Sequence, residues 1–200
     1  MNSNTRIFNA SALHLPQRLA ALISHGPAPT SHEAGLVPAG VIVPLLEKNG
    51  VWHLLFTLRS QHLPNHAGQF SFPGGVAEKA DGDLLATALR ETHEEIGVSP
   101  RDVTVLGSLE STVTPQGFRI SPFVGAIPYP YEFRVSPEEV ALLLDGPLSV
   151  LLEPSNLEIR KEMKNGVVTD SYFYRYNDHI IWGATARIVK RLLDLMAPSA

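Results

Sequence analysis

Residues 75–98 read GVAEKADGDLLATALRETHEEIGV, and this stretch decides the fold. It predicts one amphipathic helix over residues 83–96, because Asp83 can serve as its N-cap and Gly97 can close it. At about 100° per residue, one face of this helix collects the residues that a core would cover. These residues are Leu85, Ala88, Leu89, Thr92 and Ile96. The segment therefore predicts a helix packed on the rest of the domain through one buried face.

Three glutamates crowd at the edge of that buried face. Glu91 and Glu95 are four residues apart, so their carboxylates stand one above the other, and Glu94 borders the same patch. Like charges at this spacing destabilise a helix by about 0.2–0.5 kcal/mol per pair. A divalent cation reverses the sign of the interaction, because carboxylate oxygens are the hard ligands that Mg²⁺ or Mn²⁺ prefers. A solvated acidic face is the alternative, and a bare Glu-x-x-Glu-Glu pattern would favour it.

The residues around the glutamates shift the interpretation toward a functional site. Arg90 can pair with one carboxylate and hold its rotamer. Upstream, Pro73-Gly74-Gly75 lets the backbone turn tightly, so a main-chain carbonyl can point at the same metal ion. Together with the Gly97-Val98 step, these residues at fixed spacing favour a metal site over a solvated helix face.

Gly75 through Val98 resembles the Nudix box, the signature of a family of hydrolases. The core of the box, Arg-Glu-x-x-Glu-Glu-x-Gly-Val over residues 90–98, matches closely. The sequence departs from the box in three places. The Gly75-to-Arg90 spacing is one residue longer, Asp81, Gly82 and Asp83 lie where the first acidic residue belongs, and Thr92 replaces an aliphatic residue.

The resemblance implies an α+β fold, an α/β/α sandwich with a mixed central β-sheet. It also implies hydrolysis of a phosphoanhydride bond by a metal-activated water that attacks phosphorus. Carried over position by position, it makes Glu91 and Glu95 the leading ligands of Mg²⁺ or Mn²⁺. Glu94 is a third ligand or orients the water, and the carbonyl of Gly75 is a further ligand. The catalytic residues would then be Glu94, Glu95 and Arg90.

A further acidic residue is expected from beyond the box, because related enzymes often take one there. Glu139 or Glu138 could supply it. The spacing Ser136-x-x-Glu139 also fits a capping box at the start of a short helix, and this structural role is the first interpretation of Glu139.

Residues 59–75 resemble the signature of one Nudix subfamily, the coenzyme A diphosphatases. The shared pattern is Arg-Ser-x-x-Leu-x-x-His-x-Gly-Gln-x-Ser-Phe-Pro-Gly-Gly, and residues 181–187, Ile-Trp-Gly-Ala-Thr-Ala-Arg, are also similar to that subfamily. The resemblance spans roughly residues 37–195. It implies a small-molecule nucleotide substrate, coenzyme A or its thioesters, and the products 3′,5′-ADP and 4′-phosphopantetheine or its acyl form.

The same loop contains groups suited to a phosphorylated nucleotide. The guanidinium of Arg59 can donate two parallel hydrogen bonds to a phosphate, and a surface ion pair is its alternative role. His66 can donate to phosphate or orient a neighbour. Phe72 or Phe70 could stack on adenine, but the two alternate like inward-facing strand residues, so core packing is an equal alternative.

Two rival functions stay open at this point. The first is a Nudix enzyme for another nucleoside diphosphate derivative such as ADP-ribose or NADH. The second is a non-catalytic ligand-binding module on the same fold, although such modules often lose box glutamates and this chain keeps all three. The resemblance also leaves a homodimer open.

The composition of the chain argues against several classes of protein. Lys and Arg number 16 against 20 Asp and Glu, a net charge of −4 that argues against non-specific nucleic-acid binding. The absence of cysteine excludes disulfides, zinc-thiolate sites and thiol catalysis. No apolar run is long enough to predict a membrane span, and no secretory signal is evident, so a cytoplasmic location is the simplest expectation.

The rest of the chain predicts a mixed order of elements. Residues 1–36 form an arm with a short helix from about Pro16, and residues 37–197 form the Nudix domain. Strands are predicted around 41–46, 52–58, 103–109, 120–127, 157–161, 167–176 and 180–182, with Asn-Gly turns at 49–50 and 165–166 and helices opening at 136 and over 184–196. Arg187 and Arg191 predict an exposed basic face on the last helix.

Overall fold

The Asn49-Gly50 hairpin is present and begins the central sheet. Strands β1 (Val37–Lys48) and β2 (Val51–Arg59) pair antiparallel, with Lys48 opposite Val51. Asn49 has φ 50° and Gly50 φ 79°, the left-handed conformations that a two-residue hairpin turn of this kind requires. The computed structural model describes residues 15–23, 35–63, 66–164 and 166–196.

The central sheet is mixed, as predicted. Strand β7 (Phe118–Ile127) runs parallel to β1, whereas the other pairs are antiparallel. Strands β5 (Thr104–Ser108) and β6 (Thr112–Val113) pair with β7, and β8 (Val140–Pro147) pairs with β2. The two short strands β3 (Phe70–Ser71) and β4 (Gly74–Val76) pair with the end of β2 and the start of β1. They bring the glycine turn into the sheet.

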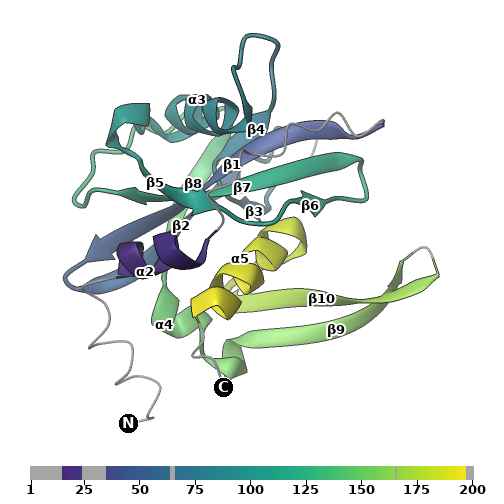
Figure 1. Ribbon diagram of the computed structural model, residues 1–200. Coiled ribbons are helices and arrows are strands. Elements are labelled where there is room, and N and C mark those ends of the chain that lie inside the picture. The colour runs from purple at the N-terminus through teal and green to yellow at the C-terminus, as the bar shows by residue number, and fades with distance from the viewer. Residues whose placement is uncertain (1–14, 24–34, 64–65, 165, 197–200) are drawn as a thin grey trace.

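Helices cover both faces of this sheet (Figure 1). Helix α3 (Leu84–Ile96) lies on one face, and α2 (Leu15–Leu22), α4 (Leu148–Leu151) and α5 (Gly183–Met196) lie on the other. Short 3-10 turns occur at Pro100–Asp102 and Pro154–Asn156. A second antiparallel sheet, β9 (Leu157–Lys164), β10 (Val167–Tyr176) and β11 (His179–Ile181), runs beside α5. The predicted α/β/α sandwich of the α+β class is therefore confirmed.

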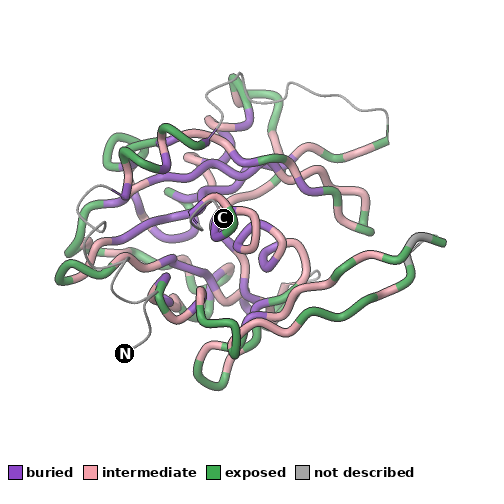
Figure 2. The backbone as a smooth tube through the Cα atoms, turned by 60° about the horizontal axis from the view of Figure 1, so that its bottom comes forward, coloured by how far each residue is buried: buried purple, intermediate pink, exposed green. Residues whose placement is uncertain are grey.

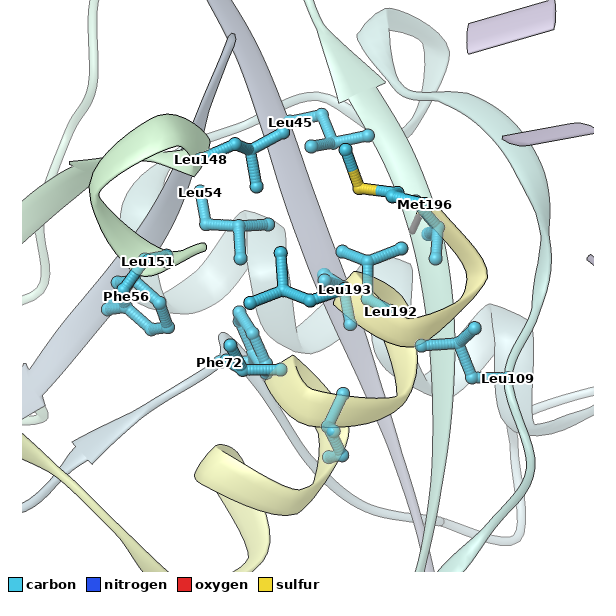
Figure 3. Packing of buried hydrophobic residues seen from close by; sticks show 14 of the residues in the cluster. Leu45, Leu54, Phe56, Phe72, Leu109, Leu148, Leu151, Leu192, Leu193 and Met196 are labelled. Carbon is cyan, nitrogen blue, oxygen red and sulfur yellow. The ribbon is translucent and has the colours of Figure 1, made fainter. Parts of the chain in front are cut away.

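The buried hydrophobic residues form two clusters, one on each face of the central sheet. Figure 2 shows that buried positions run along the central strands. Alternate residues of β1 contribute to the two clusters, because successive strand side chains point to opposite faces. Ile42 and Leu46 pack in the cluster under α3, whereas Val43 and Leu45 pack in the cluster under α5. Figure 3 shows the second cluster, in which α5 packs over β1 and β2 through Leu192 and its neighbours.

Helix α3 begins and ends as predicted and sits close to β1. The Asp83 carboxylate accepts a hydrogen bond from Ala86 N at 2.8 Å, and Gly97 closes the helix with φ 73°. Gly40 of β1 permits the close approach, because a Cβ there would overlap the carbonyl oxygen of Leu84. The buried face is rotated slightly from the predicted one: Leu84 and Thr87 are buried, whereas Leu85 and Leu89 are only partly covered.

The prediction of a helix that begins at Ser136 is wrong. Both Glu139 N and Val140 N donate to the carbonyl of Ser136, at 3.1 and 2.8 Å, and form one turn that leads directly into β8. The predicted capping box is therefore not formed. Pairing of β8 along β2, from Val140 opposite Arg59 to Pro147 opposite His53, overrides the local helix signal.

Helix α2 lies within the predicted N-terminal arm and buries Leu15, Leu19 and Ile23 in the cluster under α5. The rest of the arm, residues 1–14 and most of 24–36, lies outside the described residues, and the division into arm and domain stays a prediction. Among the described residues, no helix combines the length and the apolar character that crossing a membrane requires.

Candidate active site

The glycine turn and the glutamate helix meet at one point. The backbone N–H of Gly74 donates to Oε2 of Glu95 at 3.3 Å. A Cβ on Gly75 would lie 2.6 and 2.7 Å from the two carboxylate oxygens of Glu91, so only glycine leaves room for that carboxylate. Both glutamates therefore face the turn between β3 and α3, as the sequence predicts.

Glu95 is a buried carboxyl, with only 3% of its surface exposed. Burial raises the pKa of Glu95 to about 8, and the nearby charges of Glu139 and Glu91 add to the rise. Arg59, whose Nη1 lies 3.8 Å from Oε1 of Glu95, and the Gly74 N–H oppose it. The positive groups around Glu95 therefore do not offset its burial and the neighbouring negative charges.

Glu139 is near this site, on the turn that leads into β8. Its backbone carbonyl accepts a hydrogen bond from Ser60 N at 2.9 Å, and the next residue, Val140, lies opposite Arg59 in the sheet. The charge of Glu139 acts on both Glu91 and Glu95. Glu138 is exposed on the same turn. Of the two candidates for a further acidic residue, the structure brings Glu139 to the other carboxylates.

Glu91 and Glu94 differ in their surroundings. Burial raises the pKa of Glu91, whereas Arg90 opposes the rise. The Glu94 side chain is 51% exposed, and its Oε2 lies 2.9 Å from Nη1 of Arg90. The carboxylates of Glu91 and Glu95 therefore both approach the glycine turn, whereas that of Glu94 is bound to Arg90.

Arg90 is held by an acidic residue that sequence reasoning left without a role. Its Nε donates to Oδ1 of Asp81 at 3.0 Å and its Nη2 to Oδ2 at 3.1 Å, while Nη1 lies 3.0 Å from Oε1 of Glu91. These hydrogen bonds raise the pKa of Arg90 and hold the pKa of Asp81 well below its usual range. Arg90 therefore acts as a positioning residue for Glu91 and Glu94.

Asp81 also organises the loop before α3. Its Oδ2 also accepts from Glu78 N at 2.9 Å and from the Thr87 hydroxyl at 2.8 Å, so the loop before α3 folds back toward Arg90. The available signal was an acidic residue shortly before α3. The turn that aims this residue at Arg90 depends on contacts that no local pattern specifies.

We expect Asp81→Asn to lower turnover by about 10-fold, because loss of a partner that orients a ligand residue typically costs 10–100-fold in activity or metal affinity. The neutral amide keeps the shape but loses the charge that holds Arg90. Initial rates at saturating metal check the change. Asp83→Asn is the matched control, because asparagine also caps helices well and Asp83 makes no contact with Arg90; equal losses in both variants would contradict the role of Asp81.

The three predicted substrate-binding residues have different environments. Arg59 lies beside Glu95, and its buried Nε finds no hydrogen-bond partner among the described residues. His66 is exposed, and its Nδ1 lies 3.0 Å from Oε1 of Gln69. Phe72 is only 3% exposed and stacks on Phe56 at 5.1 Å between ring centroids. For Phe72 the structure favours the core-packing alternative, and its ring has no surface left for adenine.

The donor set fits a divalent cation. Glu91 and Glu95 present carboxylate oxygens beside the carbonyl-bearing Gly74-Gly75 turn, and Glu95 is buried with too little positive charge around it. Within the described part of the chain, no three acidic or histidine side chains already converge on one point as a ready-made metal site. The guanidinium of Arg90 instead lies between the carboxylates of Glu91 and Glu94.

Comparison with known proteins decides the family. A model of the NUDIX domain matches residues 36–161. The chain is a Nudix hydrolase. Relatives named Nudix hydrolase NudL include one from Photorhabdus laumondii, 40% identical over 77% of this chain and 82% of the relative. Another, from Yersinia enterocolitica, is 39% identical over 83% of this chain and 85% of the relative.

Solved structures share the fold of this Nudix hydrolase at low identity. A Nudix hydrolase from Alicyclobacillus acidocaldarius superimposes with a TM-score of 0.53 at 19% identity and covers 82% of this chain and 93% of that chain. A MutT/nudix family protein from Enterococcus faecalis gives a TM-score of 0.52 at 13% identity over 98% of this chain and 74% of that chain. The family assignment makes this Nudix hydrolase a diphosphatase enzyme.

Proposed function

We propose that this Nudix hydrolase cleaves the diphosphate bond of coenzyme A or its thioesters, giving 3′,5′-ADP and 4′-phosphopantetheine or its acyl form. The observation that carries the proposal is that the two ends of the segment bearing the coenzyme A diphosphatase pattern, at Arg59 and at Gly74, lie against the buried Glu95. Arg59 approaches Glu95 from the end of β2, and Gly74 approaches it from the start of β4.

The second part of the subfamily resemblance lies beside the first. The hydroxyl of Thr185, in the Ile181–Arg187 segment, donates to the carbonyl of Phe70 at 3.0 Å in the interior. The edge of the Phe70 ring packs against His179 at 5.0 Å between centroids. This contact supports a single structural unit built from two segments that are far apart in the sequence, with Phe70 bound to the start of α5.

We propose roles for the residues of this site from their positions and their chemistry. When bound, Mg²⁺ or Mn²⁺ neutralises phosphate oxygens and lowers the pKa of an attacking water. Glu91 and Glu95 would hold the ion, with the Gly75 carbonyl as a further donor. The partly exposed guanidinium of Arg59 would bind a diphosphate oxygen. Glu139, which forms no ion pair with any described residue, is the candidate to accept the proton of the water.

A substrate panel tests the proposal. Purified enzyme with Mg²⁺ or Mn²⁺ is given coenzyme A, acetyl-coenzyme A, ADP-ribose and NADH at equal concentrations, and products are resolved by chromatography and mass spectrometry. We expect 3′,5′-ADP and a 4′-phosphopantetheine product from coenzyme A at the highest kcat/KM. Turnover of ADP-ribose or NADH without turnover of coenzyme A would overturn the substrate assignment while leaving the diphosphatase chemistry intact.

A cytoplasmic location and a homodimer stay predictions from the sequence.

A further inference from the structure

Arg187 and Arg191 of α5 do not form the exposed basic face predicted from their spacing. Both side chains are half-buried beside β6. Nη1 of Arg191 donates to the Glu110 carbonyl at 2.7 Å and to the Thr112 hydroxyl at 2.8 Å, and its Nη2 pairs with the Glu110 carboxylate at 3.2 Å. Nη1 of Arg187 reaches only the Val113 carbonyl, at 3.4 Å. The donors of Arg191 are used, whereas most of those of Arg187 are not.

The charge of Arg187 is not balanced by its neighbours. No carboxylate among the described residues forms an ion pair with Arg187. Burial and the like charge of Arg191 both lower the pKa of Arg187. A partly buried cation without a counter-charge is unfavourable, and such cations in proteins are usually paired. An anion from solution would provide the missing partner.

A pocket of about 420 Å³ lies against this guanidinium, between α5 and β10. The elements that line it, α5 and β10, lie on the opposite side of the central sheet from α3 (Figure 1). Its charged and aromatic lining comprises Asp170, Tyr172, Arg187, Lys190, Arg191 and Asp194. Three basic groups and two acidic ones are among these residues.

Two of those charged groups neutralise each other. Nζ of Lys190 lies 2.6 Å from both carboxylate oxygens of Asp194 and 5.7 Å above the ring of Tyr172. Asp170 is exposed on β10 and forms no ion pair with Arg187. With Lys190 paired to Asp194 and Arg191 paired to Glu110, Arg187 is the cation left to bind a ligand.

We propose that this pocket binds a phosphate group, either as inorganic phosphate or on a small phosphate monoester, with Arg187 as the main anchor. A guanidinium presents parallel N–H donors that match phosphate oxygens, and the partial burial strengthens such a contact. Tyr172 provides a flat apolar surface beside the phosphate for the organic part of an ester. The pocket is separate from the glutamates of α3, and phosphate binding there does not depend on which substrate the enzyme hydrolyses.

An NMR titration of ¹⁵N-labelled enzyme in EDTA tests the site, because without metal the glutamate site repels phosphate. Inorganic phosphate and AMP are titrated separately. We expect saturable shifts of amides in α5 and around Tyr172, and binding weakened about 10-fold or more in Arg187→Gln, as loss of a charged hydrogen bond predicts. Tighter binding of AMP identifies the ester as the better ligand, whereas equal binding identifies phosphate alone; both support the site.

Matched variants separate a specific site from general positive charge. Arg175→Gln removes a guanidinium from the same strand, β10, that pairs with Glu158 and does not line the pocket, so it should leave binding unchanged. Arg187→Lys keeps the charge and should retain part of the affinity. Lys190→Gln provides a second lining variant if Arg187→Gln does not fold. Absence of saturable shifts in the wild type, shifts confined to α3, or equal weakening by Arg175→Gln would overturn the proposal.

Discussion

Glu95→Gln is expected to cut turnover by at least about 100-fold, because the amide is nearly isosteric but loses a negatively charged metal ligand. The fold should tolerate the change. Glu95 is 3% exposed and its burial disfavours the charged form, so a neutral amide removes an unfavourable buried charge. Initial rates on the best substrate of the wild type measure the loss, and thermal unfolding should give a Tm at or above that of the wild type.

Substitutions of two neighbouring acidic residues serve as comparisons for this result. Glu94→Gln should cause a smaller loss, because that side chain is half-exposed and contacts Arg90 on the outer side of Glu91. Glu138→Gln should leave the rate unchanged, because Glu138 is exposed on the turn before β8. If Glu95→Gln retained turnover within a few-fold of the wild type, Glu95 would have to be removed from the reaction site.

Gly75→Ala is expected to reduce turnover by about 100-fold while leaving the protein folded. The added Cβ would lie 2.6 and 2.7 Å from the two oxygens of Glu91 and push that carboxylate away from the turn. A displacement of about 1 Å at a reacting group can cost 100-fold in rate. The backbone of Gly75 is not left-handed, so alanine brings no strain of its own. Steady-state kinetics and circular dichroism measure the two effects.

Gly82→Ala is the matched control for this substitution. Gly82 is also outside the left-handed region, and a Cβ there meets no heavy atom within 4 Å. It lies in the loop just before α3 and should tolerate alanine with near wild-type turnover. Equal activity of Gly75→Ala and Gly82→Ala would show that the approach of Glu91 to the turn does not matter for the reaction.

Local signals predicted the elements that local contacts stabilise. The Asn49-Gly50 turn specified the β1–β2 hairpin, and Asp83 and Gly97 specified the ends of α3. Strands β3 and β4 were missed, because two or three residues have no readable periodicity and their pairing partners are distant in sequence. Strand β8 was missed for a related reason: its pairing with β2 outweighs the capping pattern at residue 136.

In the candidate site, too, local spacing predicted some residues, whereas contacts between distant segments place the others. The spacing of Glu91 and Glu95 on one helix, behind a Pro-Gly-Gly turn, was sufficient to predict that both face that turn. The position of Glu139 depends on the register of β8 against β2, and the role of Asp81 depends on a loop that folds back to Arg90. Neither is encoded within a few residues of the motif.

A crystal structure with manganese, in which anomalous scattering locates the ion, tests the central claim most directly. We expect one strong anomalous peak between the carboxylates of Glu91 and Glu95 and the main chain of the Gly74-Gly75 turn, with the Glu91 carboxylate drawn away from Arg90. A fully occupied manganese ion elsewhere, with Glu91 still bound to Arg90 and Glu95 still bound only to Gly74 N, would contradict it.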